Sequence, residues 1–148
     1  MNAYELWDVF RQQHPALPKK CHSWSFDREA ETLLSLVLQG KKRANCSAYD
    51  FYLQQKKELP TPGYTILCTP QGEAACILHI DKVTLHKFSD ISPTFAFKEG
   101  EGDFSLNYWR KVRSSFFTRK FAEAGWHFTP DKILVCEEFH VVYIPSKK

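Results

Sequence analysis

The chain has 148 residues, of which 43% are hydrophobic and 15% aromatic, and its formal net charge is +3. This length and composition predict one globular domain and exclude a largely disordered chain. So small a net charge excludes a uniformly basic surface, and any nucleic-acid role would need a local cluster of cations.

The N-terminal segment MNAYELWDVF carries acidic residues and lacks both the basic start and the apolar run of a signal peptide. No apolar run reaches the about 20 residues needed to span a bilayer. The five cysteines are scattered and form no C-x-x-C pair, which favours core positions over disulfides or a zinc knuckle. We therefore expect a cytoplasmic location and no membrane contact.

The first half of the chain is predicted to be mainly helical. The apolar spacing of Tyr4–Gln13 indicates a first helix. Asp27 is suited to cap a second helix whose apolar face lies in Leu33–Leu38. Gly40 follows where a left-handed C-terminal residue is expected, and Tyr49–Lys57 indicates a short, aromatic-rich helix.

The second half is predicted to be mainly sheet. Strands are predicted at Tyr64–Cys68, Ala75–Ile80, Val83–Phe88 and Ile133–Ile144. A bulge is expected near Asp81 and Lys82, whereas Pro93–Phe97 has no assigned type. Ser105 is suited to cap the longest helix, Leu106–Ala124.

The order of these elements constrains the fold class. Helices come first, then strands, then one helix and one strand, which excludes alternating βαβ units and a doubly wound sheet. We expect an α+β fold in which a small mixed or antiparallel sheet curls into a barrel flanked by helices. The whole chain, 1–148, is expected to form a single domain, with a helical extension over about residues 1–26.

Two segments stand out because packing does not explain them. The segment GKKRANCS puts three cations before small polar residues, and EGEGDFSLNYW puts two glycines among three carboxylates before a helix. Most charge runs are solvated turns, and acids before a helix often only complement its dipole. The histidines are isolated, and for His79 and His140 a strand-face or core position is more common than metal ligation.

The two segments together suggest a site. We expect Lys42 and Glu101 to meet in one solvent-reachable cleft, where a lysine of depressed pKa and a carboxylate could move a proton. Lys41 and Arg43 would add positive charge to this cleft, and aromatic side chains would stack on bases.

The same segments resemble a known family. The pattern G-x-K-x-x-(T/N)-x-S after a helix, the strand entry L-P-x-P-G-x-Y-x-I, and E-G-E-G-D-x-S-L-x-Y-W before a long helix are similar to the ASCH domain, in its roughly 150-residue bacterial branch. The resemblance implies a PUA-like fold and a role in binding RNA. Some smaller members are amidohydrolases that remove an acetyl group from N4-acetylcytidine by means of a lysine, a threonine and a glutamate.

Carried over to this chain, the resemblance gives the candidate catalytic residues as Lys42, Asn45 and Glu101. Asn45 stands where the family has threonine, and an amide is no nucleophile, so it could only donate and accept hydrogen bonds. The candidate residues for substrate or RNA binding are Lys41, Arg43, Ser47, Tyr49, Glu99, Asp103 and Trp109. No metal and no cofactor is expected.

Three functions stay open on these grounds. The first is an RNA- or nucleotide-binding module that uses the basic cleft. The second is a hydrolase on RNA or a modified nucleoside, either an amidohydrolase or a ribonuclease. The third is a non-catalytic interaction protein in which both segments only cap helices. The oligomeric state is open too, with a homodimer among the alternatives.

Overall fold

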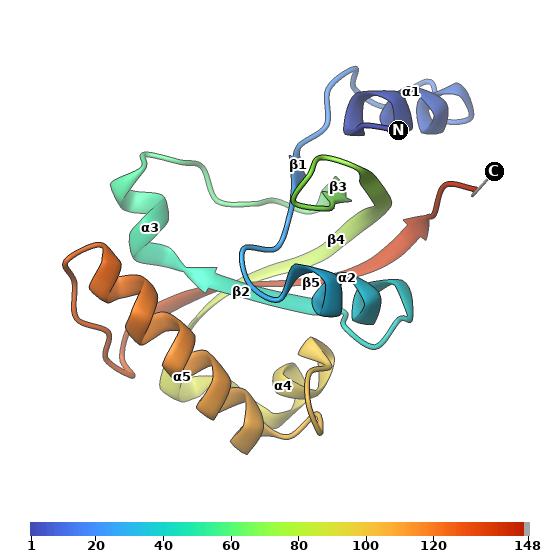
Figure 1. Ribbon diagram of the computed structural model, residues 1–148. Helices are drawn as coiled ribbons and strands as arrows, with labels where there is room; N and C mark the ends of the chain where they lie inside the picture. Colours follow the sequence, from blue (N-terminus) through green and yellow to red (C-terminus); the bar gives the residue numbers. More distant parts are fainter. Residues whose placement is uncertain (147–148) are drawn as a thin grey trace.

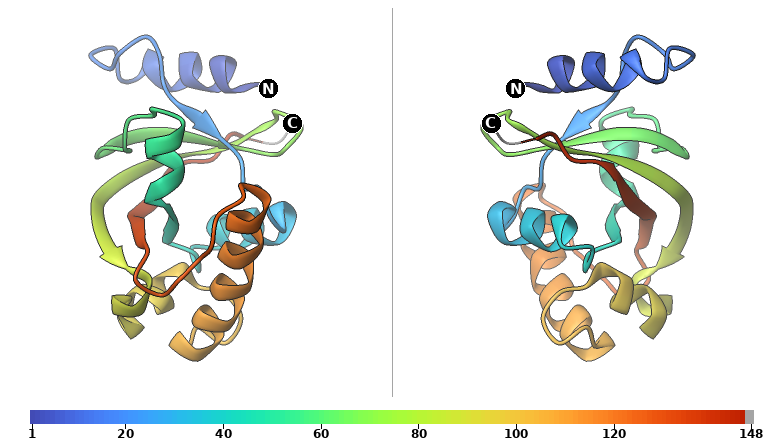
Figure 2. Two further views of the ribbon diagram at one scale, coloured as in Figure 1. Left: turned by 90° about the vertical axis from the view of Figure 1, so that its left-hand side faces the viewer. Right: turned by 90° about the vertical axis from the view of Figure 1, so that its right-hand side faces the viewer.

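In the computed structural model, residues 1–146 are described, and their strands form one five-stranded sheet of order β1-β3-β4-β5-β2 (Figure 1). The strands are β1 (Ser23–Trp24), β2 (Ala44–Ala48), β3 (Gly63–Cys68), β4 (Ala74–Lys87) and β5 (Ile133–Tyr143). Strand β1 runs parallel to β3, and the other neighbours are antiparallel. The two short strands, β1 and β2, are the edges, so the sheet is curled but not closed into a barrel (Figure 2).

Five α-helices of residues 1–146 pack around this sheet. They are α1 (Ala3–Gln12), α2 (Ala30–Leu38), α3 (Tyr49–Gln54), α4 (Pro93–Glu99) and α5 (Leu106–Glu123). The α+β class and the mixed sheet flanked by helices are thus confirmed. None of these helices has the length and apolar character that a membrane crossing requires.

Several element boundaries differ from the predictions. The two predicted strands around Asp81 are one strand, β4, with the expected bulge between Ile80 and Lys82. The unassigned segment is α4, which starts after Ser92, whose side chain accepts a hydrogen bond from the Phe95 N–H.

The predicted cap at Asp27 is wrong. Helix α2 begins at Ala30 without a side-chain cap, after Glu29 in a left-handed conformation. Asp27 instead accepts a hydrogen bond from the Lys120 ammonium on α5. The carboxylate therefore joins the segment before α2 to α5 rather than capping α2.

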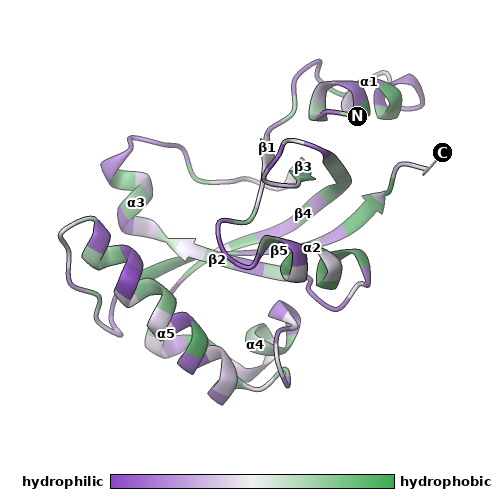
Figure 3. Cartoon of the chain, in the orientation of Figure 1, coloured by the Kyte–Doolittle hydropathy of each residue, from purple (hydrophilic) through white to green (hydrophobic). Residues whose placement is uncertain are grey.

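Three hydrophobic clusters hold these layers together. Helix α1 packs Leu6 and Trp7 against one side of β3 and β4, while α2 packs Leu33 and Val37 against the concave side. The third cluster lies between β2, β5 and α5, whose hydrophilic and hydrophobic positions alternate along its length (Figure 3). This arrangement leaves the ends of α2 and α4 beside the start of β2, where the two unusual segments lie.

Helices α2 and α4 are each followed by a glycine in a left-handed conformation. Gly40, predicted to be left-handed, has φ 75°, and Gly100 has φ 68°. A Cβ at Gly100 would lie 2.0 Å from the carbonyl oxygen of Lys41, whereas a Cβ at Gly40 would meet nothing within 4 Å. Of these two glycines, only Gly100 therefore needs both the left-handed conformation and the absence of a side chain.

We predict that Gly100→Ala lowers the free energy of unfolding by at least about 3 kcal/mol, because it combines left-handed strain with a backbone clash. Gly40→Ala is the matched control and should lower it by about 1 kcal/mol, from strain alone. Urea unfolding of both variants measures the difference. Equal losses would contradict the close approach of α4 to the start of β2.

Candidate functional site

Lys42 and Glu101 meet, as the sequence predicts. The Nζ of Lys42 lies 2.8 Å from Oε2 of Glu101 and 3.0 Å from Oε1 of Glu99, and it also donates to the Glu99 carbonyl. Lys42 lies between α2 and β2, and the two glutamates flank Gly100 at the end of α4. The Lys42 side chain is 0% exposed, so the contact lies inside the protein rather than in an open cleft.

Arg113 of α5 is the second buried cation that holds Glu99. Its NH2 group lies 2.5 Å from Oε1 of Glu99, and its Nε donates to Oε2 at 3.3 Å. The Trp109 indole and the Cys46 thiol also donate to Oε2 of Glu99. Both oxygens of the Glu99 carboxylate therefore accept hydrogen bonds.

Arg28, which precedes α2, is the third cation. Its NH2 group lies 2.9 Å from both carboxylate oxygens of Glu101. We refer to Arg28, Lys42, Glu99, Glu101 and Arg113 as the buried ionic cluster. The cluster has three cations and two carboxylates, and Arg28 also pairs with the exposed carboxylate of Glu29 at 3.3 Å.

The carboxylates in the cluster stay ionised well below neutral pH. Burial alone would raise the pKa of Glu99, but Arg113 and Lys42 outweigh it and lower the pKa to about 2. The pKa of Glu101 is lowered in the same way: burial opposes the shift, and Lys42 and Arg113 cause it. Both glutamates are therefore negatively charged at neutral pH.

A cavity of about 720 Å³ lies beside the cluster. It is bounded by the segment from β1 towards α2, by β2, by α3 with the loop after it, and by α5. In Figure 2 this segment and α5 lie opposite the concave side of the sheet. Arg28 and Arg113 belong both to the buried ionic cluster and to the cavity wall.

Strand β2 supplies two of the predicted residues to this wall. Ala44, Cys46 and Ala48 point into the core, and Asn45 and Ser47 alternate with them on the partly exposed side. The Oδ1 of Asn45 accepts a hydrogen bond of 3.1 Å from Arg113, and Ser47 pairs with the Tyr52 hydroxyl at 3.0 Å. The small residues expected to leave room for a ligand therefore form a strand at the cavity.

The three cations of the predicted basic cleft do not point to the same side. The backbone is extended here, and successive side chains of an extended chain point to opposite sides. Lys42 points inward, whereas Lys41 and Arg43 are exposed and do not line the cavity. The other predicted residues outside the cavity wall are Lys42, Tyr49, Glu99, Glu101, Asp103 and Trp109. The Asp103 carboxylate accepts from the Ser105 backbone N–H instead.

Most residues of the wall were not predicted from the sequence, among them Arg113, Phe116 and Glu137. The charge of Arg113 suggests a position on a solvent-exposed face of α5. However, Arg113 is four positions from both Trp109 and Phe117, which are buried, so it lies on the same face of the helix. This spacing was the one sequence signal for its burial. Glu137 is the cross-strand partner of Asn45. Burial raises the pKa of Glu137 to about 7, although Lys57 opposes the shift.

We predict that Glu99→Gln lowers the free energy of unfolding at neutral pH by about 3 kcal/mol or more, because Lys42 and Arg113 lose the carboxylate that both of them contact. A carboxyl with a depressed pKa stabilises the fold above its unfolded value of 4.5, and this contribution is lost as the pH falls towards about 2. The gap between wild type and Glu99→Gln should therefore narrow over that range in urea unfolding. The exposed control, Glu123→Gln, should change little; an equally mild Glu99→Gln would contradict the cluster's role.

Comparison with known proteins agrees with this fold. The family model of the ASCH domain matches residues 22–143. The solved ASCH domain from Lactobacillus crispatus JV V101 is 31% identical, with 94% of this chain and 95% of that chain covered and a TM-score of 0.81. A protein from Enterococcus faecalis V583 is 30% identical over 95% of this chain and 87% of its own, with a TM-score of 0.86. No curated protein matches.

The family match excludes only α1 and the loop after it at the N-terminal end, and it includes every residue of the buried ionic cluster. A third solved structure, a hypothetical protein that is 15% identical with a TM-score of 0.54, shares the fold alone. The family model and the two more similar structures together establish the family. The chain belongs to the ASCH domain family.

Proposed function

We propose that this protein binds single-stranded RNA and takes one nucleotide into the cavity beside the buried ionic cluster. A volume of about 720 Å³ is within the range of small-ligand sites. RNA is usually recognised through unpaired bases that stack on aromatic or guanidinium planes and bond along their edges. The cavity wall offers groups for each of these contacts.

The observation that carries the proposal is the ring of cations around Phe116 on α5. The Arg28 guanidinium lies 5.5 Å from the ring centroid, the Lys120 ammonium 5.7 Å and the Arg113 guanidinium 5.9 Å. All four side chains line the cavity. Cations interleaved with an aromatic ring suit a ligand with a phosphate and a flat base.

Asn45 and Glu137 are suited to read a base edge. The Asn45 oxygen is occupied by Arg113, but its amide NH2 group has no hydrogen-bond partner among residues 1–146. Opposite it, Glu137 accepts a proton near pH 7 and can then donate as well as accept. A donor and a titratable carboxyl on adjacent strands supply directional contacts to a base.

Binding is favoured over the alternative of hydrolysis because of the burial of Lys42. A general base must reach the proton it removes, directly or through one water. The Lys42 ammonium is bonded to both glutamates and has no exposed surface. We assign it the role of holding the two glutamates, and through them Arg28 and Arg113, at the cavity wall.

We predict that Lys120→Ala weakens binding of a fluorescent single-stranded RNA and lowers the slope of log K against log salt by about 0.7, the value for one lost phosphate contact. Lys120 is half-exposed on the cavity wall. Lys41→Ala is the matched control, because Lys41 is exposed outside the cavity, and its slope should stay nearer to that of wild type. Fluorescence anisotropy at several salt concentrations measures both. Equal slopes in the two variants would contradict binding at the cavity.

The titration of Glu137 leads to a second prediction. Above pH 7 this carboxyl ionises and repels a phosphate, so RNA affinity should fall between pH 6 and pH 8. His22, also on the wall, has its pKa lowered by burial and by Lys57. In Glu137→Gln the fall should be smaller, as measured by anisotropy. The same pH profile in both proteins would exclude Glu137 as its source.

A further inference from the structure

A second group of polar side chains lies on the outward side of the β4–β5 ladder, apart from the cavity. His79 and His140 are directly opposite each other on the two strands. Side chains of such a pair point to the same side and have Cβ atoms about 5 Å apart. The group does not line the cavity described above, so its chemistry is independent of RNA binding there.

The bulge in β4 places a carboxylate between these two imidazoles. Ile80 pairs with Phe139 and Lys82 pairs with Glu138, so Asp81 is the residue without a partner in the ladder. In an unbroken ladder Asp81 would instead face Glu138, which is a repulsive pairing. A bulge redirects the side chain that it frees.

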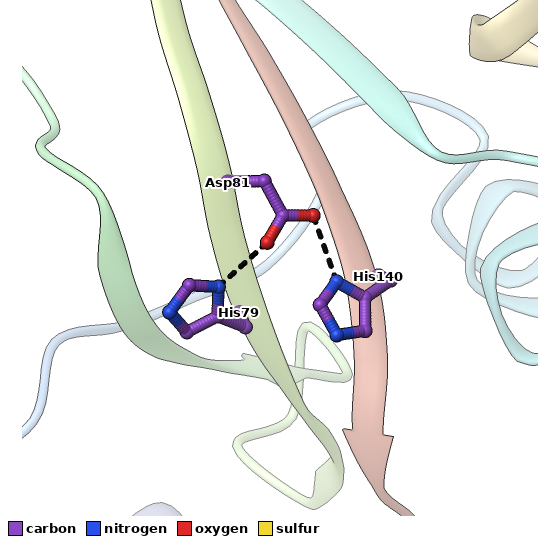
Figure 4. A group of neighbouring side chains, drawn as sticks. All are labelled: His79, Asp81 and His140. Atoms are coloured by element: carbon purple, nitrogen blue, oxygen red, sulfur yellow. Dashed lines mark hydrogen bonds and ion pairs between the residues drawn. The ribbon is translucent and has the colours of Figure 1, made fainter.

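The freed side chain of Asp81 points between the histidines (Figure 4). Its Oδ1 lies 2.7 Å from Nδ1 of His79, and its Oδ2 lies 2.7 Å from Nδ1 of His140. The ligand atoms of the three residues all lie within 4.8 Å of one another. One carboxylate and two imidazoles from adjacent strands thus converge on one point.

We propose that His79, Asp81 and His140 form a binding site for a divalent transition-metal ion, with Zn²⁺ as the best-suited ion. Two imidazole nitrogens and one carboxylate oxygen are the ligand types that Zn²⁺ accepts, and three protein ligands leave a fourth position for water. The spacing of these three residues in the sequence does not indicate a metal site, because His140 lies on a different strand from His79 and Asp81.

The geometry needs a rotation of these side chains to hold the ion. Ligands about 2.1 Å from Zn²⁺ in a tetrahedral arrangement are about 3.4 Å apart, so each hydrogen-bonded pair must open by about 0.7 Å. The most distant pair of ligand atoms, within 4.8 Å, must close by up to about 1.4 Å. The side chains are between a third and a little over a half exposed, which leaves them room to turn. The Tyr64 ring packs edge-on against His79 at 5.0 Å and limits the orientation of that imidazole.

Calorimetric titration of the full chain with ZnCl2 tests the proposal. We expect one ion per chain, and at least a tenfold weaker affinity in His79→Ala, in His140→Ala and in Asp81→Asn. His86→Ala is the matched control, because His86 is exposed on the same strand outside the group, and it should bind as wild type does. Zn²⁺ should also raise the melting temperature of wild type but not of His140→Ala.

Two further observations keep the test decisive. The Co²⁺ complex should have the visible absorption of a site with nitrogen and oxygen ligands and should lack a thiolate charge-transfer band, because Cys21, the least buried thiol, is not a ligand. The exposed positions of the three residues allow the variants to fold, which circular dichroism checks. Saturable binding that is equal in wild type and His140→Ala, or no binding to the folded wild type, would overturn the proposal.

Discussion

The buried contact between Lys42 and two glutamates is the constraint on which the rest of this structure depends. A carboxylate loses several kcal/mol of hydration when it is buried, and attraction to cations offsets this loss only if the geometry is good. Glu99 is 0% exposed, and Lys42 and Arg113 hold it from opposite parts of the chain. The ends of α2 and α4 and the middle of α5 are thereby joined at one point.

The cluster also explains why two arginines lie on the cavity wall. Three cations face two carboxylates, and two of the cations, Arg28 and Arg113, reach the cavity wall. Their guanidinium groups are fixed by Glu101 and Glu99 before any ligand arrives, so little side-chain entropy would be lost on binding. A preorganised site of this kind suits an anionic ligand that carries a flat ring.

Much of this architecture could be predicted from the sequence, and the failures have physical causes. The two unusual segments and the family resemblance predicted the contact of Glu101 with Lys42, and Ser105 identified the start of α5. Arg113 was missed because a charged residue in a helix normally faces water, whereas here Glu99 neutralises it in the core. Glu137 was missed because only strand register brings it opposite Asn45. The register of distant strands cannot be derived from local patterns.

Nuclear magnetic resonance of the indole N–H groups during an RNA titration tests the central claim most directly, because the chain contains its own control. The Trp24 indole lies on the cavity wall, whereas the Trp7 indole donates to the Pro18 carbonyl, where α1 packs on the sheet. Binding in the cavity predicts that the Trp24 signal shifts saturably and that the Trp7 signal stays in place. A saturable shift of Trp7 without a shift of Trp24 would contradict it.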